Sequence, residues 1–355
     1  MKKIVALALS VVMLLSLAIL PALAEGATGV DVKGTGVELT VYTNSGSSGR
    51  ADWLVERAAQ DGYKLTIVEE GAGAVQQRLI NEGAATPCDV VFGLNAIIWN
   101  DLISRGILQA YDAPSWAAEV SEGLNDPNGY YYAIVKQAIL LAYDKNQVSE
   151  EDAPKDWPDL WENEKFWGKY ESQIKLTGGT TRNVLAGILT RYMDPDGELG
   201  VSEEGWAAIE AFFAHGTPVE DGVDLYAQIV NPDSPVLMGQ MWSSGAIQYD
   251  EQYGTNTGVA IPEVGIPYAV EGVAITSVSK NVEEAKRFVE WFGSAQIQGE
   301  WAEKFGTMPA NEKAAEKADP VQVELCSIPA QNIDWAVVAA NIDAWCEKIM
   351  LEYMQ

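Results

Sequence analysis

Strand-like and helix-like segments alternate along the first third of the chain, and this alternation restricts the fold more than any other feature of the sequence. The strand-like segments are apolar or alternate apolar with polar residues, at 39–42, 64–69 and 89–92. Between and after them lie segments with the apolar spacing of amphipathic helices, at 50–60, 75–82 and 97–104. This repeat predicts an α/β fold with a mostly parallel sheet that is covered by helices on both faces.

The same order of strand, loop and helix returns after a stretch rich in proline and tryptophan at 153–161. There we predict a strand at 173–176, a loop at 177–181 and a helix at 182–192. A chain of 355 residues is longer than one hydrophobic core usually holds, so two lobes are expected.

Four further apolar segments predict strands that carry the chain between the lobes, at 131–136, 138–143, 258–262 and 268–275. Because the last of these returns to the first lobe, that lobe is expected to be discontinuous. The predicted division is a first lobe at 38–140 and 266–310, a second lobe at 141–265, and a C-terminal helical region at 311–355.

Loops rich in glycine and hydroxyl side chains lead from predicted strands into predicted helices. In sheets of this kind ligands bind beyond the carboxyl ends of the strands, which here are the loops at 44–49, 71–73 and 93–96. The candidate ligand contacts in these loops and in the matching loop of the second lobe are Ser45, Ser47, Ser48, Arg50, Asn95, Thr180, Thr181 and Arg182.

These two helix starts suit an anionic group. Free backbone N–H groups at a helix start, together with hydroxyls and closely approaching glycines, favour a phosphate, phosphonate, sulfonate or carboxylate. Arg50 or Arg182 would add a bidentate positive charge. The alternative is that the hydroxyls only cap the helices, although one hydroxyl for each helix would suffice for that.

The N-terminus has the pattern of a cleavable export signal at residues 1–24. Lys2 and Lys3 precede an apolar run, and Ala22-Leu23-Ala24 supplies a small-x-small cleavage site. A retained membrane anchor is the alternative, since the run approaches the length that spans a bilayer. Residues 25–37 are rich in glycine and predict a flexible leader. We therefore expect an exported protein, located in a periplasm or at the cell exterior.

Charge and residue counts exclude several classes of function. The formal net charge of −28 argues against a nucleic-acid partner, because phosphate backbones require a basic surface. The single histidine, His215, excludes zinc sites built from several histidines and leaves a serine triad only that one residue. We therefore expect neither an enzyme nor a bound cofactor.

The chain has three cysteines, too few for a fold that depends on disulfides. Cys326 and Cys346 lie in the same C-terminal region and could form a disulfide or remain free. Cys88 lies in a strand-like segment and would be a buried free thiol.

Several segments in order resemble the extracellular solute-binding proteins of ABC importers, in the family that includes ferric-ion, thiamine, polyamine, phosphonate and sugar-phosphate binders. The resemblance covers roughly residues 38–310 and rests on the segments 39–43, 85–91, 99–108, 142–146, 260–263, 271–274 and 284–292. It implies two α/β lobes that close on a ligand like a hinge. It also implies two partners, a small-molecule solute and a membrane permease, and we expect a monomer.

The resemblance adds further candidate residues at the cleft. Trp242 and Ser243 lie where the family often presents an aromatic and small polar residues to the ligand, although Trp242 could equally pack in the core. Tyr249, Tyr268 and Glu271 lie near the returning strand and would suit an amine or hydroxyl groups of a ligand.

Iron transport has less support from these residues. Ferric binders of the family use a histidine after the first strand, a glutamate after the third and a pair of neighbouring tyrosines in the second lobe. The corresponding loops here, 45–49 and 93–95, contain neither histidine nor glutamate. The preferred ligand therefore has an anionic head, such as a phosphonate or a phosphate ester. A cationic solute of the thiamine or polyamine type and, further behind, ferric ion are the alternatives.

Overall fold

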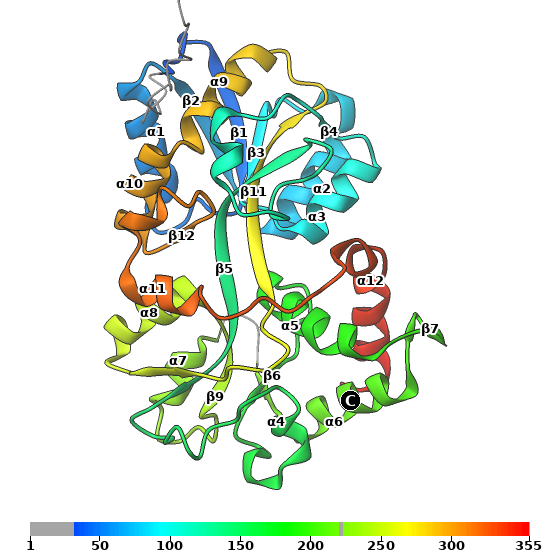
Figure 1. The fold of residues 1–355 in the computed structure, drawn as a ribbon. Helices are drawn as coiled ribbons and strands as arrows, with labels where there is room; N and C mark the ends of the chain where they lie inside the picture. Colours follow the sequence, from blue (N-terminus) through cyan, green and yellow to red (C-terminus); the bar gives the residue numbers. More distant parts are fainter. Residues whose placement is uncertain (1–31, 220–222, 355) are drawn as a thin grey trace, which may run out of the picture.

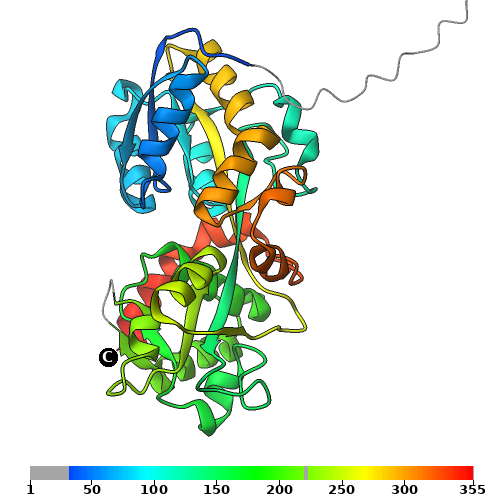
Figure 2. The ribbon, with the colours of Figure 1, turned by 90° about the vertical axis from the view of Figure 1, so that its left-hand side faces the viewer.

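A computed structural model describes residues 32–219 and 223–354. They form two lobes joined by long strands (Figures 1 and 2). The predicted signal and residues 25–31 of the predicted leader lie outside the described residues. The rest of the leader contacts the first lobe, where both Thr35 N and Thr35 Oγ1 donate to the Glu284 carboxylate, at 2.8 and 2.9 Å. Within the described residues, none of the helices is both long enough and apolar enough to cross a membrane.

The first-lobe sheet begins with three parallel strands. β1 (Glu38–Thr43) pairs in parallel with both β2 (Lys64–Glu69) and β3 (Val90–Phe92). β11 (Tyr268–Thr276) then adds antiparallel to β3, and the short β4 (Leu108–Gln109) pairs with the end of β11. In the first-lobe sheet the predicted parallel arrangement therefore holds for β1 to β3 but not for β11, because the returning strand runs in the opposite direction.

One long strand, β5 (Tyr131–Asp144), passes through both lobes (Figure 1). Its first half pairs antiparallel with β11 and with β12 (Met308–Pro309). Its second half pairs antiparallel with β9 (Met238–Trp242) and β10 (Thr257–Val259). The sequence predicted two strands separated at Gln137. That residue instead continues the pairing with β11 and accepts hydrogen bonds through its side chain from Ser243 Oγ and Ser244 N.

Helices cover both faces of the first-lobe sheet. α1 (Arg50–Gln60), α9 (Val282–Phe292) and α10 (Ala295–Phe305) pack on one face, and α2 (Ala72–Glu82) and α3 (Ala96–Ser104) pack on the other. Because side chains alternate along a strand, Val90 and Phe92 of β3 join the first core while Val91 joins the second.

The second lobe repeats this layering around the far half of β5. Ile139, Leu141 and Tyr143 point into one core, and Ala138, Leu140 and Ala142 into the other. The first core is closed by α4 (Asp159–Glu162), α5 (Gly179–Leu189), α6 (Glu203–His215) and α12 (Trp335–Glu352). The other is closed by α7 (Leu225–Ile229), α8 (Ser243–Tyr253) and α11 (Pro320–Leu325). A separate parallel pair joins β6 (Glu171–Gln173) to β8 (Thr217–Val219), and β7 (Met193–Glu198) bridges to Val201.

The C-terminal helix α12 contacts both lobes. Its buried residues Ile342, Trp345 and Ile349 lie in the second-lobe core with residues of α5 and α6. α12 also lies against α3 of the first lobe, and Ile97 of α3 belongs to the same core. The chain thus connects the lobes through β5, through β11 and through the segment that leads from β12 to α12 (Figure 1).

All three cysteines are buried and free. Cys326 lies in the core beneath α8 and α11, whereas Cys346 lies in the core beneath α12. The disulfide considered for Cys326 and Cys346 is therefore not formed, because the two thiols belong to separate cores.

Candidate ligand-binding cleft

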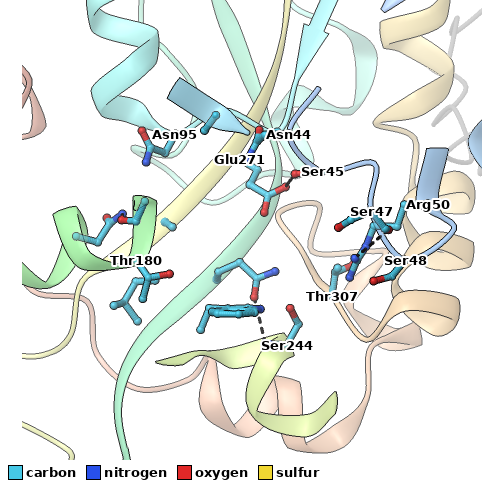
Figure 3. A pocket seen from close by; sticks show the side chains of 18 of the residues that line it. Asn44, Ser45, Ser47, Ser48, Arg50, Asn95, Thr180, Ser244, Glu271 and Thr307 are labelled. Atoms are coloured by element: carbon cyan, nitrogen blue, oxygen red, sulfur yellow. Dashed lines mark hydrogen bonds between the residues drawn. The ribbon is translucent and has the colours of Figure 1, made fainter. Parts of the chain in front are cut away.

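A cleft of about 500 Å³ lies where the two lobes face each other. Figure 3 shows Thr180 of the second lobe on one side and Ser47, Ser48, Arg50 and Thr307 of the first lobe on the other. The lining is dominated by hydroxyl and amide side chains, and among the described residues its titratable members are Arg50, Tyr249 and Glu271. Nine of the thirteen candidate residues line it, namely Ser45, Ser47, Ser48, Arg50, Asn95, Thr180, Trp242, Tyr249 and Glu271. Their contact with a solute stays a prediction.

The first-lobe wall is the loop between β1 and α1. Ser48 and Gly49 both have positive φ, of 58° and 80°, and Gly49 is the N-cap of α1 with no side chain bonded to the helix start. The serine hydroxyls therefore do not cap α1, which was the alternative reading of this loop. Gly93 lets the loop after β3 approach, because a Cβ there would lie 2.5 Å from Ser45 Oγ.

Two other helices begin at the cleft without side-chain caps. α2 starts after Gly71 and α5 after Gly178, and in neither does a side chain accept from the first backbone N–H groups. Gly71 and Ala72 line the cleft from the first lobe, and Gly179 and Thr180 line it from the second. Uncapped helix starts present N–H groups and the positive end of the helix dipole to whatever occupies the cleft.

Arg50 is the positively charged side chain of the cleft. Its guanidinium donates two long hydrogen bonds, to the backbone carbonyls of Ser47 and Phe305, both at 3.4 Å. Among the described residues no carboxylate forms an ion pair with it. Burial lowers the pKa of Arg50, and the negative charges of Glu271 and Glu69 act in the opposite direction. The charge is thus partly desolvated without a direct counter-ion.

Thr307 lies next to this arginine (Figure 3) and was missed by the sequence analysis. Its side chain is 4% exposed, and its hydroxyl has no hydrogen-bond partner. Asn44 Oδ1, in the opposite loop of the same lobe, is also without a partner. A buried hydroxyl that makes no hydrogen bond is costly unless a ligand supplies the missing partner.

Glu271 lies at an irregularity of β11, where the register with β5 shifts. It accepts a hydrogen bond from Ser45 Oγ at 2.8 Å. Burial raises the pKa of Glu271 to about 7, although the bond from Ser45 and the charge of Arg50 lower it. The carboxyl can therefore change its protonation state near neutral pH.

This pKa predicts how stability depends on pH in the ligand-free protein. The folded state holds the Glu271 proton more tightly than the unfolded state, whose glutamate pKa is about 4.3. The stabilisation is complete below that value and is lost as the pH rises towards 7. We expect the free energy of unfolding to fall by about 1–3 kcal/mol through this group between pH 5 and pH 8. Urea unfolding measured across this pH range should show a smaller fall in the free energy of unfolding for Glu271→Gln. The same pH dependence in both proteins would contradict the raised pKa of Glu271.

Four candidate residues lie away from the cleft lining. Arg182 pairs with Asp343 of α12 at 2.7 Å, because it lies on a face of α5 turned from the cleft. Thr181 is 8% exposed and accepts from Gln240 Nε2. Ser243 is fully buried at the start of α8. Tyr268 donates its hydroxyl to Ile328 O at 2.8 Å.

The aromatic candidates of the second lobe that do reach the cleft are Trp242 and Tyr249. Their ring centroids lie 6.0 Å apart in an edge-on arrangement, and 36% of Trp242 is exposed. Trp242 is therefore a cleft residue rather than a core residue. Within residues 32–219 and 223–354, no group of three or more His, Cys, Asp or Glu side chains is placed to hold a metal ion.

Comparison with known proteins supports one family. The sequence profile of the bacterial extracellular solute-binding proteins matches residues 86–337. A probable ABC transporter periplasmic-binding protein, y4fP, of Sinorhizobium fredii is 34% identical over 89% of this chain and 87% of its own length.

Two solved structures have the same two-lobed fold. Iron-bound HitA from Pseudomonas aeruginosa superposes with a TM-score of 0.72 at 21% identity, covering 88% of this chain and 99% of that one. The Trichodesmium protein IdiA (FutA), in complex with iron and citrate, gives 0.72 at 17% identity, covering 89% and 100%. At these sequence identities the similarity shows a shared fold and nothing about the ligand.

Proposed function

This chain belongs to the bacterial extracellular solute-binding proteins, and from that premise we propose that its solute carries an anionic head group held in the cleft. The protein is the solute-binding component of an ABC importer and not an enzyme. Its partners are a small molecule and a membrane permease. The family also implies an exported location. We propose that residues 1–24 direct this export and that the mature protein works as a monomer.

The buried hydroxyl of Thr307 beside the unpaired guanidinium of Arg50 is the observation that carries the proposal. Each of these groups is desolvated without a strong partner of its own. An anionic oxygen would accept hydrogen bonds from both, and such charge-assisted bonds are the stronger class. The uncapped starts of α2 and α5 supply backbone donors from both lobes. The oxygens of a phosphonate or a phosphate ester could accept hydrogen bonds from all of these donors.

Ferric ion and organic cations are the competing solutes. The two structural neighbours described above are iron proteins by name, which keeps ferric ion among the candidates. However, the cleft lining offers one tyrosine and one glutamate as anionic metal ligands, and Arg50 lies among them. Among the described residues that line the cleft itself, Glu271 is the one carboxylate that a cation would meet beside Arg50. The residues therefore favour an anionic head.

A binding screen tests the proposal. We expect phosphate, methylphosphonate or glycerol phosphate to raise the melting temperature of the mature protein, because a ligand that binds only the folded state stabilises it. Spermidine, thiamine and ferric citrate serve as the competing classes. Stabilisation by these alone would overturn the proposal. Small-angle scattering with the best anion should show a more compact particle if the lobes close.

Replacing Thr307 by valine should separate stability from binding. Valine keeps the shape but removes a hydroxyl that has no partner, so the ligand-free protein is expected to be equally or more stable. Affinity for the best anion should fall about tenfold, because one hydrogen bond to a charged group is lost. Thermal melts and calorimetry measure the two effects. Unchanged affinity in Thr307→Val would remove this hydroxyl from the site.

A further inference from the structure

A side pocket of about 270 Å³ opens from the cleft into the second lobe. It shares Gly179, Thr180, Trp242 and Tyr249 with the cleft, so the two spaces are continuous along the start of α5. Beyond these shared residues the lining changes in character. Two carboxylic acids, Glu171 and Asp224, enter it.

Glu171 is the unusual group in this side pocket. It is 5% exposed, and its two oxygens accept from Gln240 N at 3.2 Å and from Gln173 Nε2 at 3.1 Å. Among the described residues no lysine or arginine forms an ion pair with it. Carboxylates are rarely buried without a cationic partner, because desolvation of the charge is then uncompensated.

The surrounding residues hold this carboxyl in place. Gly239 leaves the space that it occupies, since a Cβ at that position would lie 2.4 Å from Glu171 Cγ. Gln240 donates its backbone N–H to Glu171 and its side-chain amide to Thr181 Oγ1 at 2.7 Å. The carboxyl is therefore fixed between β6 and the start of α5, on the side of the second lobe that adjoins the cleft.

We propose that the side pocket receives a primary ammonium group of the solute, so that the solute is a zwitterion. This inference rests on the proposed function, because the anionic head of the same molecule would occupy the cleft. Glu171 supplies the buried negative charge, and Asp224 supplies a second carboxylate in the same lining. Trp242 and Tyr249, at the junction of the two spaces, present aromatic rings to the link between the two charged ends.

Proton release provides a signature of such binding. Burial raises the pKa of Glu171 to about 8, the bonds from Gln240 and Gln173 lower it, and the charge of Asp224 raises it. The other charged group of the lining is Lys175, whose side chain is exposed. At pH 7 the empty site therefore holds a largely protonated Glu171. An incoming ammonium favours the carboxylate, so Glu171 itself should release close to one proton, while Glu271 in the cleft takes up part of a proton when the anionic head binds beside it.

The test compares phosphonates with and without an amine. We expect 2-aminoethylphosphonate or 3-aminopropylphosphonate to bind the mature protein at least tenfold more tightly than the ethyl or propyl compound of the same length. Calorimetry at pH 7 in buffers of different ionisation enthalpy should report close to one more proton released when the amine binds the unaltered protein than when it binds Glu171→Gln, because the ionisation of the phosphonate and of Glu271 is common to both. Glu171→Gln should abolish both the tenfold advantage and this additional proton release. Glu164→Gln, which changes an exposed glutamate of the same lobe, should leave both unchanged.

The outcomes separate this inference from the function on which it rests. If alkyl and aminoalkyl phosphonates bind equally and Glu171→Gln changes neither, the ammonium site is wrong while the anionic cleft stands. If Glu171→Gln weakens both kinds of ligand equally, its role is structural and the ammonium site is again wrong. If neither kind binds, the proposed function itself fails. The tenfold difference between amine and alkyl compound is measured on the unaltered protein, so the inference can be tested even if Glu171→Gln does not fold.

Discussion

Arg50→Gln is expected to weaken binding of the best anion about 100-fold, because a hydrogen bond to a charged group contributes about 1.5–3 kcal/mol and each 1.4 kcal/mol is tenfold. The guanidinium donates two hydrogen bonds of 3.4 Å to backbone carbonyls and lies 5.2 Å from the centroid of the Phe305 ring, so it can turn to a ligand without breaking an ion pair. Because no ion pair is lost, the free energy of unfolding of the ligand-free variant should lie within about 0.5 kcal/mol of that of the unaltered protein. Calorimetry and urea unfolding give the two quantities.

Arg182→Gln is the matched control. Arg182 also follows a polar loop at the start of a helix, but its guanidinium is paired with Asp343 and does not line the cleft. Affinity for the same anion should therefore stay within about twofold, because Arg182 makes no contact in the cleft. Loss of its surface ion pair should lower the free energy of unfolding by about 0–1 kcal/mol. Equal losses in the two variants would show that general charge attraction, and not a contact with Arg50, holds the anion.

Trp345→Ala is expected to destabilise the protein by about 3–5 kcal/mol, the usual cost of removing a large buried aromatic side chain. Trp345 is fully buried in the second-lobe core, and its indole N–H donates to Leu199 O at 3.0 Å. The substitution leaves a cavity beneath α12 and an unpaired carbonyl. Equilibrium unfolding in urea, monitored by the fluorescence of the remaining tryptophans, measures the loss.

Met350→Ala serves as the control on the same helix. Met350 is 48% exposed, so its truncation should change the free energy of unfolding by no more than about 0.5 kcal/mol. A loss below about 1 kcal/mol in Trp345→Ala would mean that α12 adds little to the second lobe. Its buried contacts would then not report on the stability of the whole protein.

The sequence predicted the elements of this fold better than their arrangement. The bounds of α1 and β2 agree with the periodicity, because amphipathic and alternating apolar spacing and terminal glycines act locally. The direction of β11 was not predictable from such local signals. It follows from which neighbour the returning strand meets, and that depends on contacts far apart in the sequence. The predicted break at Gln137 failed because residues of α8 satisfy its side chain within the strand.

The site shows the same division between local and distant information. The loop 44–49 was identifiable because hydroxyls, glycines and an arginine follow a strand directly. Neighbours on a helix point about 100° apart, so adjacency to Thr180 did not bring Arg182 to the cleft lining, and Thr181 lines the adjoining side pocket instead. Thr307 carries no local signal at all. Gln137 also lines the cleft, and it could have been identified from the sequence as a polar residue inside an apolar strand.

The central strand of the first-lobe sheet, β11, is synthesised long after the strands beside it. β11 lies between β3 and β5, yet it begins only at Tyr268, after most of the second lobe. During synthesis β1 can pair with β2 and β3, but the other edge of β3 stays unpaired until β11 has been synthesised. Folding that depends on such distant pairing is slow. We therefore expect the newly made chain to remain unfolded for longer, which is the state in which an exported protein can pass through a translocation channel.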